Sequence, residues 1–204
     1  MSRIVQKKNI YYRMKFKDAV IESVKKISSP EFIQRIKEED NTMLVHLNIL
    51  KKINKCGYIT TESQAGHKRS GISDFDGKHF TIHERAYISG FMLESVAAKF
   101  IKEIAVHTDK NAIFVPYCED NVYIPGKLDI PLTITEKGGK IDINTHSSST
   151  LPRYVWDSYR KEAQINKNEK IVLIFCWDTK WNRNASKKNG LFYDLARILE
   201  MIEN

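Results

Sequence analysis

The sequence contains little cysteine, proline and glycine, and it has no long apolar run. Its three cysteines, Cys56, Cys118 and Cys176, are odd in number and widely spaced, and none belongs to a C-x-x-C pair. This excludes a disulfide-stapled secreted domain and a cysteine zinc site, and it predicts a reducing, intracellular compartment. Nine Gly and five Pro in 204 residues leave no room for a long flexible linker.

Membrane-spanning and targeting segments are also lacking. The longest apolar run, Ile171 to Trp177, has seven residues, whereas a membrane helix needs about 20. The first 14 residues are polar and basic, without the apolar centre of a signal peptide. We therefore expect no membrane association and no secretion. The expected location is cytoplasmic or otherwise intracellular, with a viral protein as one option.

Positive charge is in excess, and it is unevenly spread. The formal net charge is +8, and residues 1–60 carry 13 basic and 6 acidic side chains. A basic N-terminal third is typical of a surface for nucleic acid or an acidic protein, although solvated helices give the same pattern. Only 9 of the 33 basic residues are Arg, the better residue for paired contacts to phosphate.

The hydrophobic periodicity predicts several helices. We expect them at 16–27, from Pro30 after a Ser29 cap, at 42–55 with Gly57 as the stop, at 152–163 and at 191–202. The longest is expected at 82–106, because Thr81 and Glu84 have the spacing of a capping box.

Strands are expected at 58–61, within 112–146 with a turn at Gly138-Gly139, and over the apolar run from 171. The fold prediction is a single α+β domain over residues 1–204. A mixed sheet of five or six strands would pack against the long central helix and the C-terminal helix. Residues 1–56 would form a basic helical part, and residues 57–204 a part that contains the sheet.

Two polar segments stand out as candidate ligand sites. The first is G-Y-I-T-T-E-S-Q-A-G at 57–66, followed by E-R-A-Y-I-S-G-F at 84–91. A helix beginning there would present free amides to an anion. We therefore expect contacts from side chains of the first segment and the helix start: Thr61, Ser63, Gln64, Glu84 and Arg85. The same residue types also cap turns and pair locally.

The second segment is W-D-T-K-W-N-R-N at 177–184, just beyond the best strand. Ligands often bind beyond strand ends, and an aromatic ring with fixed donors suits a nucleotide, a base or a peptide terminus. The candidate residues here are Asp178, Trp181, Arg183 and Asn184. The alternative is that Trp181 packs under the loop while Asp178 and Arg183 pair to hold it.

These motifs together resemble a domain family of actinobacterial and viral proteins whose function is unknown. That family carries G-[FY]-x-T-x-x-S-Q-x-G, [EQ]-R-A-x-x-x-G-F and D-P-x-W-G-R-N elements. Thr179 and Asn182 depart from the last element, where the family has Pro and Gly. The resemblance covers residues 43–98 and 171–198. It implies a shared site and no particular chemistry.

Metal and cofactor chemistry have weaker support. Three His and two Asp lie within residues 67–83, namely His67, Asp74, Asp76, His79 and His83. Asp74-Phe75-Asp76-Gly77 begins like a calcium loop, but the later Glu that such a loop needs is missing. Asp129 with Glu136 and Lys137 lacks the acid-x-Lys spacing of nucleases. We expect no metal and no cofactor.

The function prediction is a polar pocket for a small anionic ligand, with a nucleotide as first choice. Whether the ligand is turned over stays undecided. If the protein is an enzyme, Glu84 or Asp178 is the expected general base. The alternatives are a structural or interaction protein, such as a minor virion component, and a modest nucleic-acid binder that uses the N-terminal lysines. The oligomeric state is not predicted.

Overall fold

The structure is a computed structural model that describes residues 14–108, 112–118, 129–147 and 151–203. Its helices are α1 (Phe16–Ser28), α2 (Pro30–Glu39), the 3-10 helix η1 (Asn41–His46), α3 (Leu47–Lys55), α4 (Glu94–His107), α5 (Arg153–Glu162) and α6 (Leu191–Glu203). The strands are β1 (Ile59–Gln64), β2 (Lys68–Ile72), β3 (His79–Leu93), β4 (Ala112–Cys118), β5 (Asp129–Lys137), β6 (Lys140–Ser147) and β7 (Ile171–Trp181). The α+β class is confirmed.

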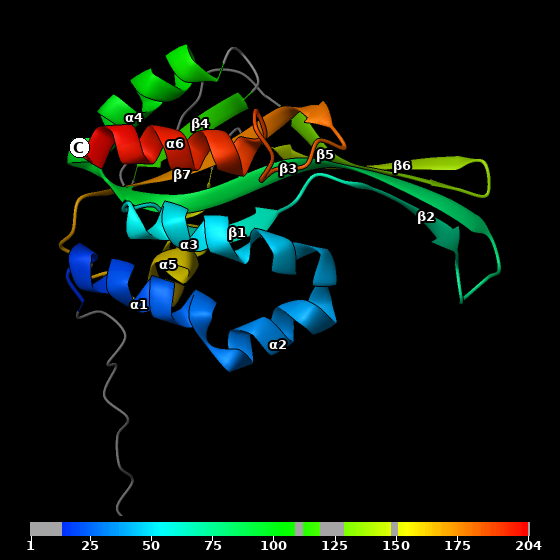
Figure 1. The fold of residues 1–204 in the computed structure, drawn as a ribbon, viewed down its shortest axis with the longest axis horizontal. Coiled ribbons are helices and arrows are strands. Elements are labelled where there is room, and N and C mark those ends of the chain that lie inside the picture. The colour runs from blue at the N-terminus through cyan, green and yellow to red at the C-terminus, as the bar shows by residue number, and fades with distance from the viewer. Residues whose placement is uncertain (1–13, 109–111, 119–128, 148–150, 204) are drawn as a thin grey trace, which may run out of the picture.

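All seven strands belong to one sheet, and the long strand β3 joins its two halves. The inner half of β3 pairs with β1 on one side and β7 on the other, and β4 lies beyond β7. The outer half pairs with β2 and β5, and β6 lies beyond β5. All pairs between these strands are antiparallel, so the prediction of a mixed sheet of five or six strands is wrong in both strand direction and strand number. Figure 1 shows β2 and β6 on an arm that extends away from the helices.

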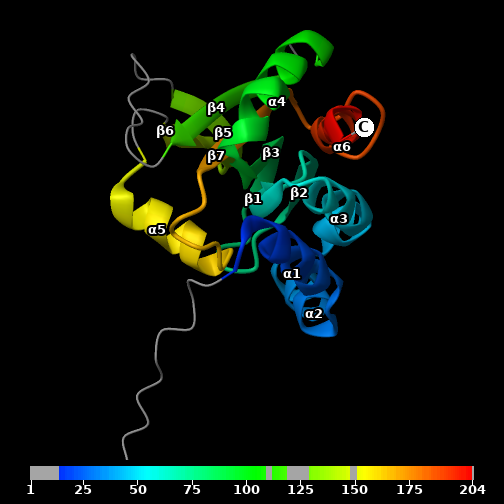
Figure 2. The same ribbon diagram turned by 90° about the vertical axis from the view of Figure 1, so that its left-hand side faces the viewer.

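Helices pack on both faces of the inner half-sheet. In β7, Val172, Ile174 and Cys176 face a core built with α3, α4 and α6. Leu173 and Phe175, which alternate with them, face a second core that contains Trp156 of α5. A strand buried on both faces needs such a continuous apolar run, which is why β7 was predictable. Figure 2 shows α5 on one side of the sheet and α3 and α6 on the other.

Several predicted helix ends and turns are confirmed. The Ser29 side chain accepts a hydrogen bond from the Phe32 amide (3.1 Å), and Pro30 begins α2. Gly57 has φ +82° after α3, and Gly138 and Gly139 have φ +54° and +77° in the β5–β6 turn. Side chains of this kind act within a few residues, so the sequence is sufficient to place them.

The predicted long helix at 82–106 is wrong in its first half. Residues 79–93 form β3, and helix α4 begins only at Glu94, so Thr81 and Glu84 form no capping box. This segment is a strand because it pairs with β1 and β7, and a side chain from before β1 packs closely on it. The Tyr58 ring lies where a side chain at position 90 would stand, 2.4 Å from a Cβ placed on Gly90. The Tyr58 hydroxyl also donates to the Ile174 carbonyl (2.6 Å) and so ties β1 to β7 across β3.

Candidate functional site

The two predicted segments meet at the middle of β3, through backbone rather than around a cavity. A Cβ placed on Gly66 would lie 2.6 Å from the Ala86 nitrogen and 2.9 Å from the Arg183 carbonyl oxygen. Glycine at position 66 therefore permits the chain after β1, strand β3 and the loop after β7 to approach this closely. Asn182 fixes the same contact, because its amide donates to the Glu84 carbonyl (2.8 Å).

Asp178 and Arg183 hold the loop after β7. Asp178 is fully buried, and the Arg183 guanidinium donates to both of its carboxylate oxygens, with an Nε–Oδ2 distance of 2.7 Å. The Lys180 amide also donates to Oδ1 (2.7 Å). Asn184 accepts from the Ser186 amide (3.1 Å) and so shapes the next turn. With both oxygens engaged and no exposure, Asp178 is poorly placed to act as a general base.

Trp181 lies opposite Arg85 in the β3–β7 register. The Arg85 guanidinium lies 4.6 Å from the ring centroid of Trp181, in a cation–π arrangement. Burial lowers the pKa of Arg85, and Asp178 opposes that shift. The Gln64 side chain donates to the Arg85 carbonyl (3.2 Å). One face of the indole is thus already covered by a side chain of the protein.

Glu84 is a buried carboxylate in a strand, not the start of a helix. Its side chain is 7% exposed, with Nδ1 of His67 at 2.9 Å and the Arg69 guanidinium at 3.3 Å. Burial raises the pKa of Glu84, while His67 and Arg69 act to lower it. Sequence reasoning missed the two partners. His67 and Arg69 are two positions apart, which places them on the same face of an extended chain. This spacing was the sequence signal that could have indicated a shared acidic partner.

A second missed contact attaches the 182–190 loop to the N-terminal part. His46 in η1 is buried, and its Nδ1 lies 2.5 Å from the Ser186 hydroxyl. The His46 ring also packs edge-on against Phe192, with 5.8 Å between ring centroids. Burial lowers the pKa of His46. No local pattern in the sequence pairs positions 46 and 186.

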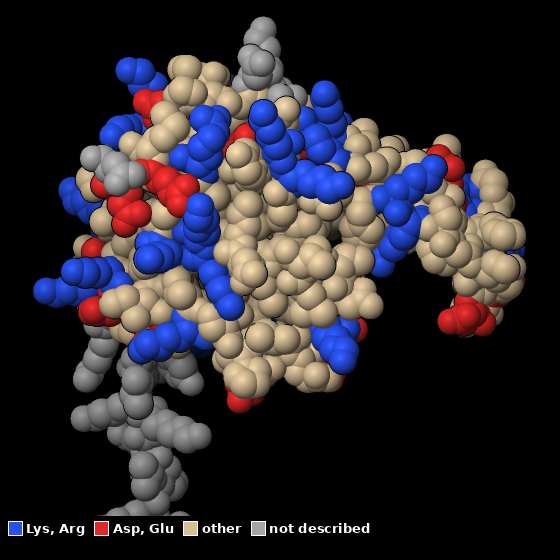
Figure 3. All heavy atoms as spheres, viewed as in Figure 1, with Lys and Arg blue, Asp and Glu red and all other residues tan. Residues whose placement is uncertain are grey.

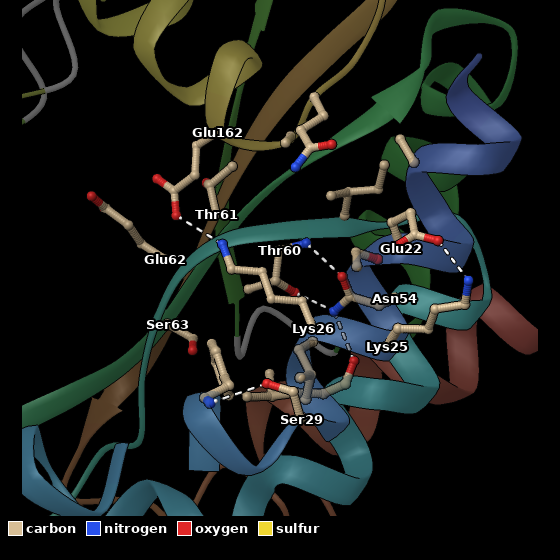
Figure 4. A pocket seen from close by; sticks show the side chains of 18 of the residues that line it. Glu22, Lys25, Lys26, Ser29, Asn54, Thr60, Thr61, Glu62, Ser63 and Glu162 are labelled. Carbon is tan, nitrogen blue, oxygen red and sulfur yellow. Dashed lines mark hydrogen bonds and ion pairs between the residues drawn. The ribbon is translucent and has the colours of Figure 1, made fainter. Parts of the chain in front are cut away.

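A cavity in the part of the chain that the structure describes lies elsewhere, beside β1. It is open to solvent on one side, has a volume of about 610 Å³ and is bordered by β1, helices α1 and α2, the end of α3, Tyr87 of β3 and the end of α5 (Figure 4). This volume is in the usual range for a small-ligand site. Of the nine predicted residues, Thr61 and Ser63 line it. The seven that do not are Gln64, Glu84, Arg85, Asp178, Trp181, Arg183 and Asn184.

Strand β1 presents its edge to this cavity. Five consecutive residues, 59 to 63, line it. Since neighbouring side chains of a strand point to opposite faces, an unbroken run indicates that the backbone edge faces the space. β3 is the only strand that pairs with β1 among the described residues. On its outer side, the Thr60 amide donates to the side chain of the buried Asn54 (3.0 Å).

The cavity walls carry charges of both signs. In Figure 4, Lys26 of α1 reaches Glu162 of α5 (3.1 Å), and Lys25 pairs with Glu22 (2.6 Å). The Tyr159 hydroxyl donates to Glu62 (2.6 Å). Burial, and then this hydrogen bond, raise the pKa of Tyr159. Carboxylates slightly outnumber cations among the lining residues, which are Glu22, Glu39, Glu62 and Glu162 against Lys25, Lys26 and Arg35.

The positive charge of the N-terminal third does not lie on its first two helices. Helices α1 and α2 contain five basic and five acidic side chains. The surplus belongs to three lysines of α3 and to the residues before α1, most of which lie outside the described ranges. Figure 3 shows basic and acidic side chains intermixed over the helical side of the visible face. The excess positive charge of residues 1–56, which were expected to form a basic helical part, therefore does not lie on α1 and α2.

Metal-ligating side chains do not cluster in the part of the chain that the structure describes. Within it, no three His, Cys, Asp or Glu side chains are arranged to hold a metal ion. No described helix is long and apolar enough to cross a membrane.

Comparisons with known proteins give no assignment. No protein-family model matches the chain, and no curated protein matches it either. The resemblance to the actinobacterial and viral domain family therefore stays a prediction.

Proposed function

We propose that this chain is a binding protein, and that its ligand occupies the cavity beside β1. The proposal rests on one observation: the five consecutive residues 59–63 of β1 line a cavity of about 610 Å³, so the edge of the strand faces it. A strand edge offers alternating amide donors and carbonyl acceptors, and proteins use such edges to bind extended peptides as an added strand.

The ligand we favour is a short extended stretch of polypeptide. Strand β1 has six residues, which at about 3.3 Å per residue corresponds to roughly 20 Å of edge. Only the five residues 59–63 of this edge line the cavity, so a peptide of about five residues would match the part of the edge that faces it. The lysines of the walls are already paired with carboxylates, and a peptide backbone, which carries no net charge, can bind without displacing either partner.

The charge arrangement makes a nucleotide the competing ligand rather than the first choice. Lys25 and Lys26 each have a carboxylate within hydrogen-bonding distance, and Arg35 lies 3.9 Å from Glu39. A phosphate would have to displace these carboxylates and would then lie beside them. That repulsion opposes binding of an anion of several charges.

Two serine variants on α1 test the cavity. Ser23 lines it, and its hydroxyl donates to the Val20 carbonyl (2.7 Å). Ser28 is exposed and does not line it, and its hydroxyl donates to the Val24 carbonyl (2.8 Å). Ser23→Phe therefore fills the cavity, and Ser28→Phe is a matched control with the same loss of a local hydrogen bond.

The probes are an array of immobilised pentapeptides and a panel of nucleoside mono-, di- and triphosphates. We expect wild type and Ser28→Phe to bind the same subset of peptides, and Ser23→Phe to lose that binding. Nucleotide binding that Ser23→Phe abolishes would support the cavity and contradict the peptide. Binding of neither class, or binding that both variants retain, would contradict the cavity.

A further inference from the structure

Strand β6 is an edge strand with one side unpaired among the described residues. Among the described residues it pairs with β5 alone, and residues 140–145 are exposed on both faces. In Figure 1 it lies on the arm, away from the helices. An open edge of this kind pairs readily with another strand unless its side chains prevent it.

The side chains of β6 favour pairing on one face. Ile141 is 67% exposed and Ile143 is 51% exposed. Residues two apart on a strand share a face, so these side chains form an apolar pair that β5 does not cover. Burying such a pair against a second apolar strand is favourable.

The charges of β6 are complementary to those of a second, antiparallel copy. Lys140 and Asp142 share the opposite face, and neither has an ion-pair partner among the described residues. If Ile141 of one copy lies opposite Ile141 of the other, each Lys140 lies opposite the Asp142 of the other copy. Shifting the copies so that Ile141 faces Ile143 would instead place the two Asp142 carboxylates opposite each other, which is unfavourable.

Strand β2, the other open edge of the arm, lacks this property. Its charged residues are Lys68 and Arg69, both exposed and both positive. An antiparallel pair of β2 strands would bring together charges of one sign, which is a common protection of sheet edges. We propose that the chain forms a two-fold dimer through antiparallel pairing of β6 with β6 of a second copy, in the register that joins Lys140 to Asp142.

Charge reversal tests the register with little risk to folding, because both positions are exposed. In Lys140→Asp, both contacts between positions 140 and 142 of the two copies place one carboxylate opposite another. In Asp142→Lys, both contacts place one ammonium group opposite another. Each single variant is expected to weaken dimerisation roughly tenfold. The double variant restores opposite charges and is expected to dimerise like wild type. An equimolar mixture of the two single variants is expected to form a heterodimer.

Analytical ultracentrifugation of the full chain over a range of concentrations gives the measurement. About 0.15 M salt reduces the repulsion between two copies of net charge +8. Lys68→Asp on β2 is the control and is expected to leave the dimer unchanged. Wild type that stays monomeric at every concentration overturns the proposal. A dimer that neither single variant weakens uses another surface and overturns it as well.

Discussion

Removing the guanidinium of Arg183 should destabilise the whole fold. Asp178 is fully buried, and Arg183 donates to both of its oxygens. In Arg183→Met the carboxylate remains in the interior without its partner. Leaving a buried charge unpaired in this way costs about 3–5 kcal/mol. For a chain of this length each kcal/mol lowers Tm by about 2–4 °C, so the expected decrease in Tm is about 6–20 °C.

Urea unfolding of Arg183→Met measures this free energy, with an unchanged m value as the sign that the unfolded state is the same. The matched control is Arg35→Met. Arg35 lies 3.9 Å from Glu39 with both side chains at least half exposed, so its loss should cost no more than about 0.5 kcal/mol. The double variant Asp178→Asn with Arg183→Met removes the orphan charge and should be more stable than Arg183→Met alone. If Arg183→Met is no less stable than Arg35→Met, Asp178 and Arg183 do not hold the loop.

Two further predictions concern the contacts around β3. Gly66→Ala should destabilise the fold by about 1–3 kcal/mol, because its Cβ would lie 2.6 Å from the Ala86 nitrogen and 2.9 Å from the Arg183 carbonyl. In Gly71→Ala the added Cβ would lie 3.1 Å from an aromatic side chain rather than from backbone atoms, so this variant should lose less free energy of unfolding in the same urea experiment. Equal losses in the two variants would contradict the close backbone approach at Gly66. Burial lowers the pKa of His46 below 6.5, so the unfolded chain binds more protons than the folded one and stability falls as the pH drops below about 6.5. His46→Gln should show a smaller fall than wild type between about pH 7.5 and pH 5, and equal falls would contradict this assignment.

The sequence was sufficient wherever structure depends on neighbours in the chain. The Ser29 cap, the Gly57 stop and the Gly138-Gly139 turn are all local, and β7 is apolar throughout its inner part. It was insufficient for β3, because the spacing of Tyr87 and Phe91 fits a helix as well as a strand. Pairing with β1, β2, β5 and β7, none of which is visible in the local spacing, decides between the two.

For the candidate site too, local features were predictable and features set by distant contacts were not. The segments at 57–66 and 177–184 contain polar residues with defined partners, and the structure brings them together at β3. The cavity could not be predicted, since it exists only because α1, α2 and α5 lie along the open edge of β1. Of the predicted residues, only Thr61 and Ser63 line that cavity. Strand β2, with sequence KRSGI, has no apolar alternation and is formed by its pairing with β3.

Hydrogen exchange of the β1 backbone, with and without the best-binding pentapeptide, tests the central claim most directly. A peptide added to the open edge would bond the amides of residues 61–63 that point away from β3, about every second one along a strand, and the exchange of those amides should slow by about tenfold or more. Exchange at 178–184 should change little. Unchanged exchange along β1 in the presence of a bound peptide, or slowing confined to 178–184, would contradict the account.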